Sequence, residues 1–401
     1  MGGFLLMLFT HAVFGQELET FLEHAKTNHN GLQATYSQYQ AVVEKTNQAG
    51  TLPDPTFSAG IFILPVETRV GPQVMKLSLA QRFPWFGTLK AEKEVMKRKS
   101  LIVLQAYDIQ WREIEYTITK SWYELNNTQQ LIHYHMELLS LHESLHDLTL
   151  TKFEAGSANL TAVLRIQMAI DEYKIKIEGL TDLLDTKKTR FNLLVNRPAE
   201  EAINLPDSII SQVIALPPFD SISSHPKIRQ LERERESLQS DLELIKYKGR
   251  PGIGLGLDYV MTGKRTDMAV QDNGKDVLMP MISFSLPIFR KKYRSMKDEV
   301  GYRIEESENR LDNELTILQS EYEQAEWQYQ ESSRNVVLYQ ELIEKSNKVS
   351  DLLITEFSVS GEYLNDILDI HEDILNYRIR QLNALTDRYV AAAKIKSLTG
   401  S

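Results

Sequence analysis

The chain contains the same short turn segment twice, and each copy separates two long helical patterns. Residues 151–164 read TKFEAGSANLTAVL, and residues 355–368 read TEFSVSGEYLNDIL. Phe153 and Phe357 hold equivalent positions in the two copies, 204 residues apart (153 to 357). Glycine, serine and asparagine in a break between helical segments are typical of a turn. We therefore expect the chain to be built twice around the tip of a helical hairpin.

Hydrophobic residues recur every seven residues on both sides of the first turn. Before it, the repeating positions are Leu104, Trp111, Ile118, Leu125, Ile132 and Leu139. After it, they are Val163, Ile170, Ile177, Leu184 and Phe191. A heptad pattern sustained over this length predicts coiled-coil packing. A helix over residues 88–150 would be roughly 90 Å long at ~1.5 Å per residue, which is more than a globular domain needs.

Each half of the chain also contains two segments of alternating polarity. They cover residues 56–64 and 75–83 in the first half, and 252–261 and 278–288 in the second. A period of two predicts β-strands with two different faces. Strands of this length, in a chain without a long apolar helix, match those of transmembrane β-barrels. Four strands cannot close a barrel, so three chains would supply twelve; the alternative is a soluble α+β protein with a small sheet.

These patterns together predict two structural repeats joined by an irregular connector. The expected segments are a signal peptide (1–15), a first repeat (16–198, with a β-hairpin at 56–83 and a tip near 153–160), an equatorial connector (199–224), and a second repeat (225–401, with a β-hairpin at 252–288 and a tip near 357–364). The first 15 residues are apolar and end in small residues, as secretory signals do. A buried N-terminal helix is the alternative for this segment.

Composition and two local patterns limit the classes of function. The net charge of −10 argues against nucleic-acid binding, and the absence of cysteine excludes thiolate chemistry. Residues 142–146 (HESLH) fit the HExxH zinc-peptidase pattern, in which His142 and His146 would bind the metal. Leu145 nevertheless lies in an apolar row, and no third ligand is identified. A weak surface metal site is the alternative, but we predict neither an enzyme nor a metal or cofactor site.

The sequence LSLAQRFPWFG after the second strand, FSLPIF at the equivalent place in the second half, and both turn segments resemble the TolC family of outer-membrane factors. The resemblance covers nearly the whole chain. It implies a trimeric, 12-stranded transmembrane β-barrel, with four strands per chain, continuous with a periplasmic α-helical barrel of long coiled coils. The segments VETRVGPQ and PWFG are most similar to the heavy-metal (CusC/CzcC-like) branch, while drug or protein export remains open.

The resemblance implies a passive exit duct in the cell outer membrane, with the helical barrel in the periplasm. The homotrimer would receive substrate from an inner-membrane pump of the RND type and a periplasmic adaptor (a membrane fusion protein), in a tripartite efflux or type I secretion system. The positions matching the adaptor-contact tips are Phe153, Gly156, Ser157, Phe357, Ser360 and Gly361. The alternative is an exported periplasmic coiled-coil scaffold or interaction protein without a pore.

Two further groups of residues are assigned expected roles. Aromatic residues follow the second strand of each hairpin, where contact with outer-membrane lipid at the membrane interface is expected: Trp85, Phe86, Phe289 and Tyr293. Members of the family constrict the periplasmic end with aspartate rings on the helix after the second tip. Asp366 and Asp369 match that position, three residues apart on one helix face. The resemblance therefore predicts a periplasmic gate that favours cations.

Overall fold

The structure is a computed structural model that describes residues 13–209, 214–360 and 364–400. The chain divides into two compact units, each assembled from distant parts of the sequence. The first, here called the helical unit, comprises Met1–Ala34, Tyr107–Pro226 and Leu315–Ser401. The second, the strand unit, comprises Thr35–Ala106 and Lys227–Glu314. Both units therefore draw on both halves of the sequence.

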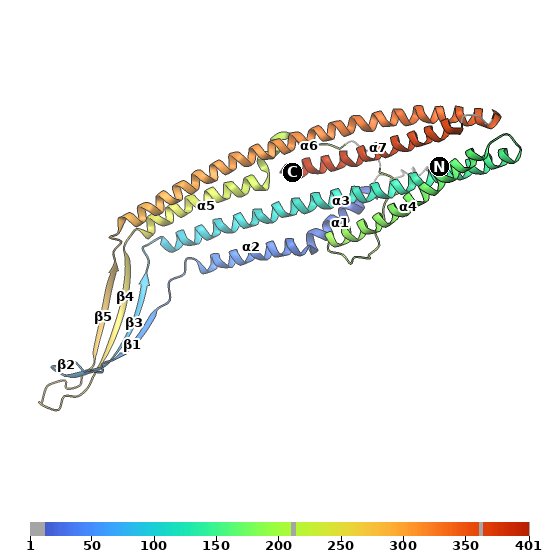
Figure 1. Ribbon diagram of the computed structural model, residues 1–401. Coiled ribbons are helices and arrows are strands. Elements are labelled where there is room, and N and C mark those ends of the chain that lie inside the picture. Colours follow the sequence, from blue (N-terminus) through green and yellow to red (C-terminus); the bar gives the residue numbers. More distant parts are fainter. Residues whose placement is uncertain (1–12, 210–213, 361–363, 401) are drawn as a thin grey trace, which may run out of the picture. The chain divides into compact units, whose positions relative to one another are not determined.

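Long helices form two hairpins (Figure 1). The helices are α1 (Val13–Asn28), α2 (Asn30–Gln48), α3 (Thr88–Glu154), α4 (Leu160–Leu194), α5 (Pro226–Lys248), α6 (Arg290–Ser360) and α7 (Leu364–Leu398). The hairpins are α3–α4 and α6–α7, and both have their tips in the helical unit. The connector contains one short 3-10 helix, Phe219–Ser224. None of the helices in the described ranges has an apolar stretch long enough to cross a membrane.

The core of the helical unit follows from the heptad pattern. Ile118 and Leu125 of α3 are fully buried at predicted seam positions. Trp122 lies one turn from Ile118 and packs against the rings of Phe21 and Phe191 at centroid distances of 5.4 and 5.7 Å. Seven-residue spacing keeps such side chains on one face of a helix, so consecutive turns contribute to the same seam.

Charged side chains link the two hairpins along α3 and α7. Arg378 on α7 donates to Glu137 on α3 at 2.6 Å, and Lys396 donates to Glu115 at 2.8 Å. These pairs join residues more than 200 positions apart and have no counterpart in the local periodicity of the sequence. They fix how α7 lies along α3, because each long side chain reaches only a few ångströms.

The strand unit contains one antiparallel sheet (Figure 1). Its strands are β1 (Thr56–Ile61), β2 (Glu67–Thr68), β3 (Gly71–Phe83), β4 (Gly252–Thr262) and β5 (Val277–Ser285), in the order β1-β3-β4-β5, with β2 paired to β3. β3 and β4 come from different halves of the chain. Their pairing joins the two β-hairpins into one sheet. β5, which corresponds to the predicted strand at residues 278–288, ends at Ser285, just before the Leu286-Pro287 pair. This is three residues earlier than the alternation predicts. Proline lacks the N–H that a ladder requires.

The two faces of the sheet differ in polarity. Register places Leu77 opposite Tyr259 and Leu79 opposite Leu257 on one face. Successive residues point to opposite faces, so Ser78 and Asp258, which are also opposite each other, lie on the second face. Asp258 there forms an ion pair with Lys76. One face of the sheet is thus broadly apolar, and the other carries charges and small residues.

Candidate functional site

The first tip is a tight turn between α3 and α4. Gly156 has φ = 73°, a left-handed conformation that a residue without a Cβ adopts at little cost. Its N–H donates to the carbonyl of Phe153 at 2.9 Å. The backbone N–H and the hydroxyl of Ser157 both donate to the carbonyl of Lys152, at 2.8 and 3.0 Å. Asn159 then caps α4 by accepting from the N–H of Ala162 at 2.8 Å.

The second tip differs from the first, although the sequence aligns them. α6 stays helical through Ser360, the residue equivalent to Gly156, and α7 begins at Leu364. Serine carries a Cβ that disfavours the left-handed conformation, so the helix continues where the first copy turns. Gly361, which was also predicted as an adaptor contact, lies outside the described residues. The expected equivalence of the two turns therefore fails at this position.

The two tip phenylalanines have opposite environments. Phe153 is 38% exposed, whereas Phe357 is 1% exposed. Phe357 packs in a cluster at the base of both tips, with Leu145, Ile166, Ile170, Leu364 and Ile367. A side chain this deeply buried cannot present its ring to a partner in this conformation. Phe153, Gly156 and Ser157 lie on the surface, while Phe357 supports the tip from inside.

Hydrogen bonds join the two tips to each other. Lys152 Nζ lies 3.4 Å from the carbonyl oxygen of Ser358 and 5.5 Å from the centre of the Phe357 ring. Arg165 donates to the side-chain oxygen of Asn365 at 3.0 Å. Local sequence patterns missed both links, because each joins residues about 200 positions apart. Their only sequence signal is that each pair contains a long cation near one turn and an acceptor near the other.

A groove with a volume of about 710 Å³ lies between the tips. Gly156, Ser157 and Arg165 line it from the first tip, and Phe357 and Asp366 line it from the second. Asp369 is one turn further along α7, and both aspartates are exposed. The buried residues Leu364 and Ile367 alternate with them, so the acidic face of α7 points away from the hydrophobic cluster. The structure thus brings one predicted gate residue to the same groove as the predicted contact residues.

The predicted interface aromatics lie where β3 and β5 lead into long helices. β3 and β5 run parallel to each other, since each is antiparallel to β4, so these ends lie at one edge of the sheet. Phe86 and Phe289 are among the most exposed aromatic side chains. Trp85 is partly covered by Arg250, whose guanidinium lies 5.8 Å from the ring centre. Tyr293 is half-buried, with Lys292 Nζ at 5.9 Å.

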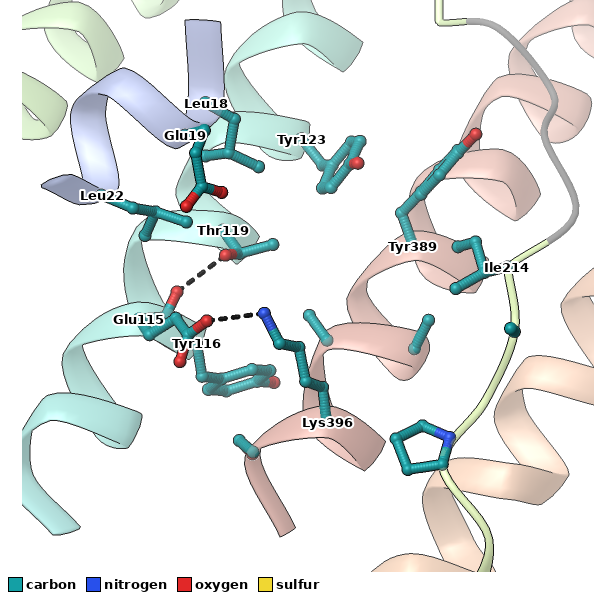
Figure 2. Close-up of a pocket in the computed structure, with 15 residues that line it drawn as sticks. Leu18, Glu19, Leu22, Glu115, Tyr116, Thr119, Tyr123, Ile214, Tyr389 and Lys396 are labelled. Carbon is teal, nitrogen blue, oxygen red and sulfur yellow. Dashed lines mark hydrogen bonds and ion pairs between the residues drawn. The ribbon is translucent and has the colours of Figure 1, made fainter. Parts of the chain in front are cut away.

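A second cavity, of about 500 Å³, lies among α1, α3, α7 and the end of the connector (Figure 2). Tyr123 and Tyr389 stack at 4.5 Å on one side of it, and the ion pair of Glu115 with Lys396 lies on another. Burial raises the pKa of the Tyr123 hydroxyl, so it stays neutral. Glu115 also accepts from the Thr119 hydroxyl through its carbonyl oxygen. Glu115 and Lys396 thus neutralise each other in this cavity, while Glu19 adds a further carboxylate to its wall.

The two histidines of the HExxH segment face different parts of the fold. His142 is 1% exposed and faces His371, with ring centroids 5.7 Å apart. His146, in contrast, lies 3.5 Å from its neighbour Asp147 at the surface. Across residues 13–209, 214–360 and 364–400, no three His, Cys, Asp or Glu side chains converge in a way that could hold a metal. The two histidines of the motif therefore have separate environments.

Comparison with known proteins identifies the class of fold. No family model matches the chain. No curated protein matches it closely. Solved structures do: CusC, described in connection with transmembrane channel formation, has a TM-score of 0.77 at 14% identity, with 96% of this chain and 92% of that chain covered. The outer membrane protein VceC from Vibrio cholerae has a TM-score of 0.76 at 14% identity, with 96% of both chains covered.

A third structure, the open state of the Neisseria gonorrhoeae MtrE outer membrane channel, also has a TM-score of 0.76 at 14% identity, covering 96% of this chain and 89% of that chain. Similarity of this extent at such low identity demonstrates the fold. The chain has the fold of the outer-membrane channel proteins. The resemblance to TolC-family outer-membrane factors, predicted from the sequence, is thereby confirmed at the level of the fold.

Proposed function

We infer that this chain is an outer-membrane exit duct, which passively conducts substrate delivered by an inner-membrane pump and a periplasmic adaptor. The observation that carries this inference is the likeness in fold to outer-membrane channels over 96% of the chain. The proposed setting is a tripartite efflux or type I secretion system with a pump of the RND type. The chain would act as a conduit and not as an enzyme.

The sheet supports a trimer. β1 and β5 are its edge strands, and in the described part of the chain neither has a strand on its outer side. Unpaired edges with an apolar face invite pairing with another copy, and a membrane-embedded sheet must close on itself. Three chains would close twelve strands, with the apolar face toward outer-membrane lipid and the face of Ser78 and Asp258 toward the lumen. Trp85, Phe86, Phe289 and Tyr293 would then mark the membrane boundary.

The long helical hairpins would form the periplasmic tunnel, and their tips would meet the adaptor. Phe153, Gly156 and Ser157 are the exposed candidates for that contact. Ser360 and Gly361 are proposed as contacts from their positions in the sequence alone. Phe357 would act indirectly, by holding the second tip against the first. This division of roles makes the two tips unequal partners in docking.

Purified full-length protein tests the duct against the pore-free scaffold. We expect migration as a trimer in SDS without heating, conversion to a monomer on boiling, recovery in the outer-membrane fraction, and stepwise conductance in a planar lipid bilayer. Closed β-barrels resist SDS because every strand is paired. A monomer found in the soluble periplasmic fraction, without conductance, would instead favour an exported coiled-coil scaffold.

The aspartates of α7 supply a second test of the proposed gate. Around a threefold axis, Asp366 and Asp369 would form two stacked carboxylate rings that attract cations. We expect Asp366→Asn with Asp369→Asn to increase single-channel conductance and to lower the cation-to-anion permeability ratio several-fold. Asp182→Asn, an exposed aspartate on α4, is the matched control and should change neither quantity. An unchanged permeability ratio in the double variant would rule out the gate assignment.

A further inference from the structure

Four helices of the two hairpins each contribute one polar side chain to a buried layer next to the tips. These are His142 on α3, Tyr173 on α4, Ser350 on α6 and His371 on α7. The His142 ring lies 5.2 Å from the Tyr173 ring and 5.7 Å from the His371 ring, centre to centre. The Ser350 hydroxyl lies 3.0 Å from Nε2 of His371. In this layer the two hairpins meet through polar side chains that are mostly buried.

Several polar atoms of this layer have no hydrogen-bond partner within the described chain. His142 and His371 are 1% and 2% exposed. Within the described chain, neither ring nitrogen of His142 has a hydrogen-bond partner, and Nδ1 of His371 has none either. Buried polar atoms without partners are rare in native proteins, so each such group needs a reason. An apolar residue would pack here without that cost, and neither the proposed barrel nor the proposed gate uses these imidazoles.

We propose that the His142–His371 pair is a proton-sensitive joint between the two hairpins, which holds them together when neutral and releases them when it is protonated. Two imidazolium ions at this separation would repel each other in a buried site of low dielectric. Each would also lose the hydration that a cation requires. The packed arrangement is therefore compatible only with neutral rings, whereas an opened arrangement admits water and accepts the protons.

Within the described chain, no carboxylate stabilises the protonated form of either imidazole. On α3, His135 is also buried and Glu137 is paired with Arg378 of α7. On α4, Glu172 lies near Tyr173 and Lys176 near His135; on α7, Glu372 acts on Tyr173. α6 contributes the uncharged Ser350 and Asn347. Glu172 and Glu372 act on the Tyr173 hydroxyl, whose pKa is raised to about 12 chiefly by burial, so they do not neutralise an imidazolium.

Water has a route to the joint. A cavity of about 190 Å³ reaches His371, with Ser350 and Asn347 beside it and the pair of Glu137 with Arg378 also on its wall. A water molecule occupies about 30 Å³ of liquid, so several fit in this space. A proton can therefore reach the layer without complete unfolding of the bundle.

Burial sets the pH range of the joint. It lowers the pKa of His371 from an ordinary 6.5 to about 4, and burial together with the neighbouring His371 lowers the pKa of His142 to about 4 as well. Between these values the opened state binds protons that the packed state does not. The packed state of the joint is thus most stable above about pH 6.5, and its stability decreases as the pH falls toward 4. At pH 5 the opening equilibrium would rise about 20-fold per histidine relative to pH 7.

The tips lie next to this layer. Leu145, Ile170 and Ile367 belong to the hydrophobic cluster under the tips, and each is three or four residues from a member of the polar layer. Loosening the joint would therefore release the cluster that holds Phe357. The consequence for adaptor docking and gating rests on the proposed function, whereas the proton sensitivity itself does not.

Amide hydrogen exchange and NMR of the full-length protein in detergent test the joint without requiring a pore. After correction for chemical exchange rates, we expect protection at the tip ends of α4 and α7 to fall at least ~10-fold between pH 7 and pH 5. His142→Gln with His371→Gln replaces both groups of the joint by neutral amides and should remove most of that fall, leaving only the contribution of the buried His135. His133→Gln, at an exposed histidine of α3, is the control and should behave as the wild type.

The wild-type protein alone also decides the question. If the ring protons of His142 and His371 titrate near pH 6.5 while the tips stay protected, the joint does not exist. The same conclusion holds if the double variant keeps the full pH dependence. A chain that shows the expected exchange but no conductance would support the joint and contradict the duct. A chain that conducts but shows no pH-dependent loss of protection would support the duct and contradict the joint.

Discussion

Replacing Phe357 by alanine is expected to lower the stability of the tip region by about 3–5 kcal/mol. The substitution removes a ring that is 1% exposed from the cluster of Leu145, Ile166 and Leu364, and it leaves a cavity among side chains from both hairpins. It also removes the ring that lies 5.5 Å from Lys152 Nζ. Loss of transfer free energy and formation of a cavity add to each other at such a site.

The equivalent residue of the first repeat provides the matched control. Phe153→Ala truncates the same side chain at a position that is 38% exposed, so it should cost less than about 1 kcal/mol. Amide exchange of α4 and α7 next to the tips measures the local opening free energy in both variants. Adaptor binding is expected to show a different pattern, because Phe153 offers direct contact and Phe357 does not. Equal losses of local stability would show that the two tips are equivalent after all.

The different burial of Phe153 and Phe357 could not be predicted from the similarity of the two turn segments. Periodicity is a local property, so it located the long helices and the alternating strands to within a few residues. It could not determine which of two equivalent phenylalanines is buried, because that depends on how one hairpin lies against the other. Nor could the alignment of Ser360 with Gly156 show that the chain turns at Gly156 but stays helical through Ser360.

The candidate site illustrates the same distinction. The exposure of Asp366 and Asp369 follows from their helical spacing relative to Leu364 and Ile367, which is visible in the sequence. The bond between Arg165 and Asn365 is not, since it joins residues of different repeats. The HExxH pattern pairs His142 with His146, whereas in the structure His142 faces His371. The partner that gives His142 its environment, His371, is 229 residues away (142 to 371) and belongs to no motif.

The second large effect is expected at Trp122, the centre of the core of the helical unit. Trp122→Ala should destabilise this unit by about 3–5 kcal/mol, because the indole is fully buried among α1, α3 and α4. Its rings contact Phe21 and Phe191, whose own edge-to-face contact at 5.1 Å depends on that packing. Thermal unfolding of the purified protein, followed by circular dichroism, measures the loss as a lower midpoint.

Trp122→Phe separates the packing of the indole from its polarity. The indole Nε1 has no hydrogen-bond partner within the described chain, so phenylalanine removes a buried donor that stabilises nothing. The cost should therefore be clearly smaller, about 1–2 kcal/mol from lost volume. Trp327→Ala, at an exposed tryptophan of α6, should leave the midpoint nearly unchanged. If Trp122→Phe were as damaging as Trp122→Ala, the indole N–H would have to make a contact that the packed core does not contain.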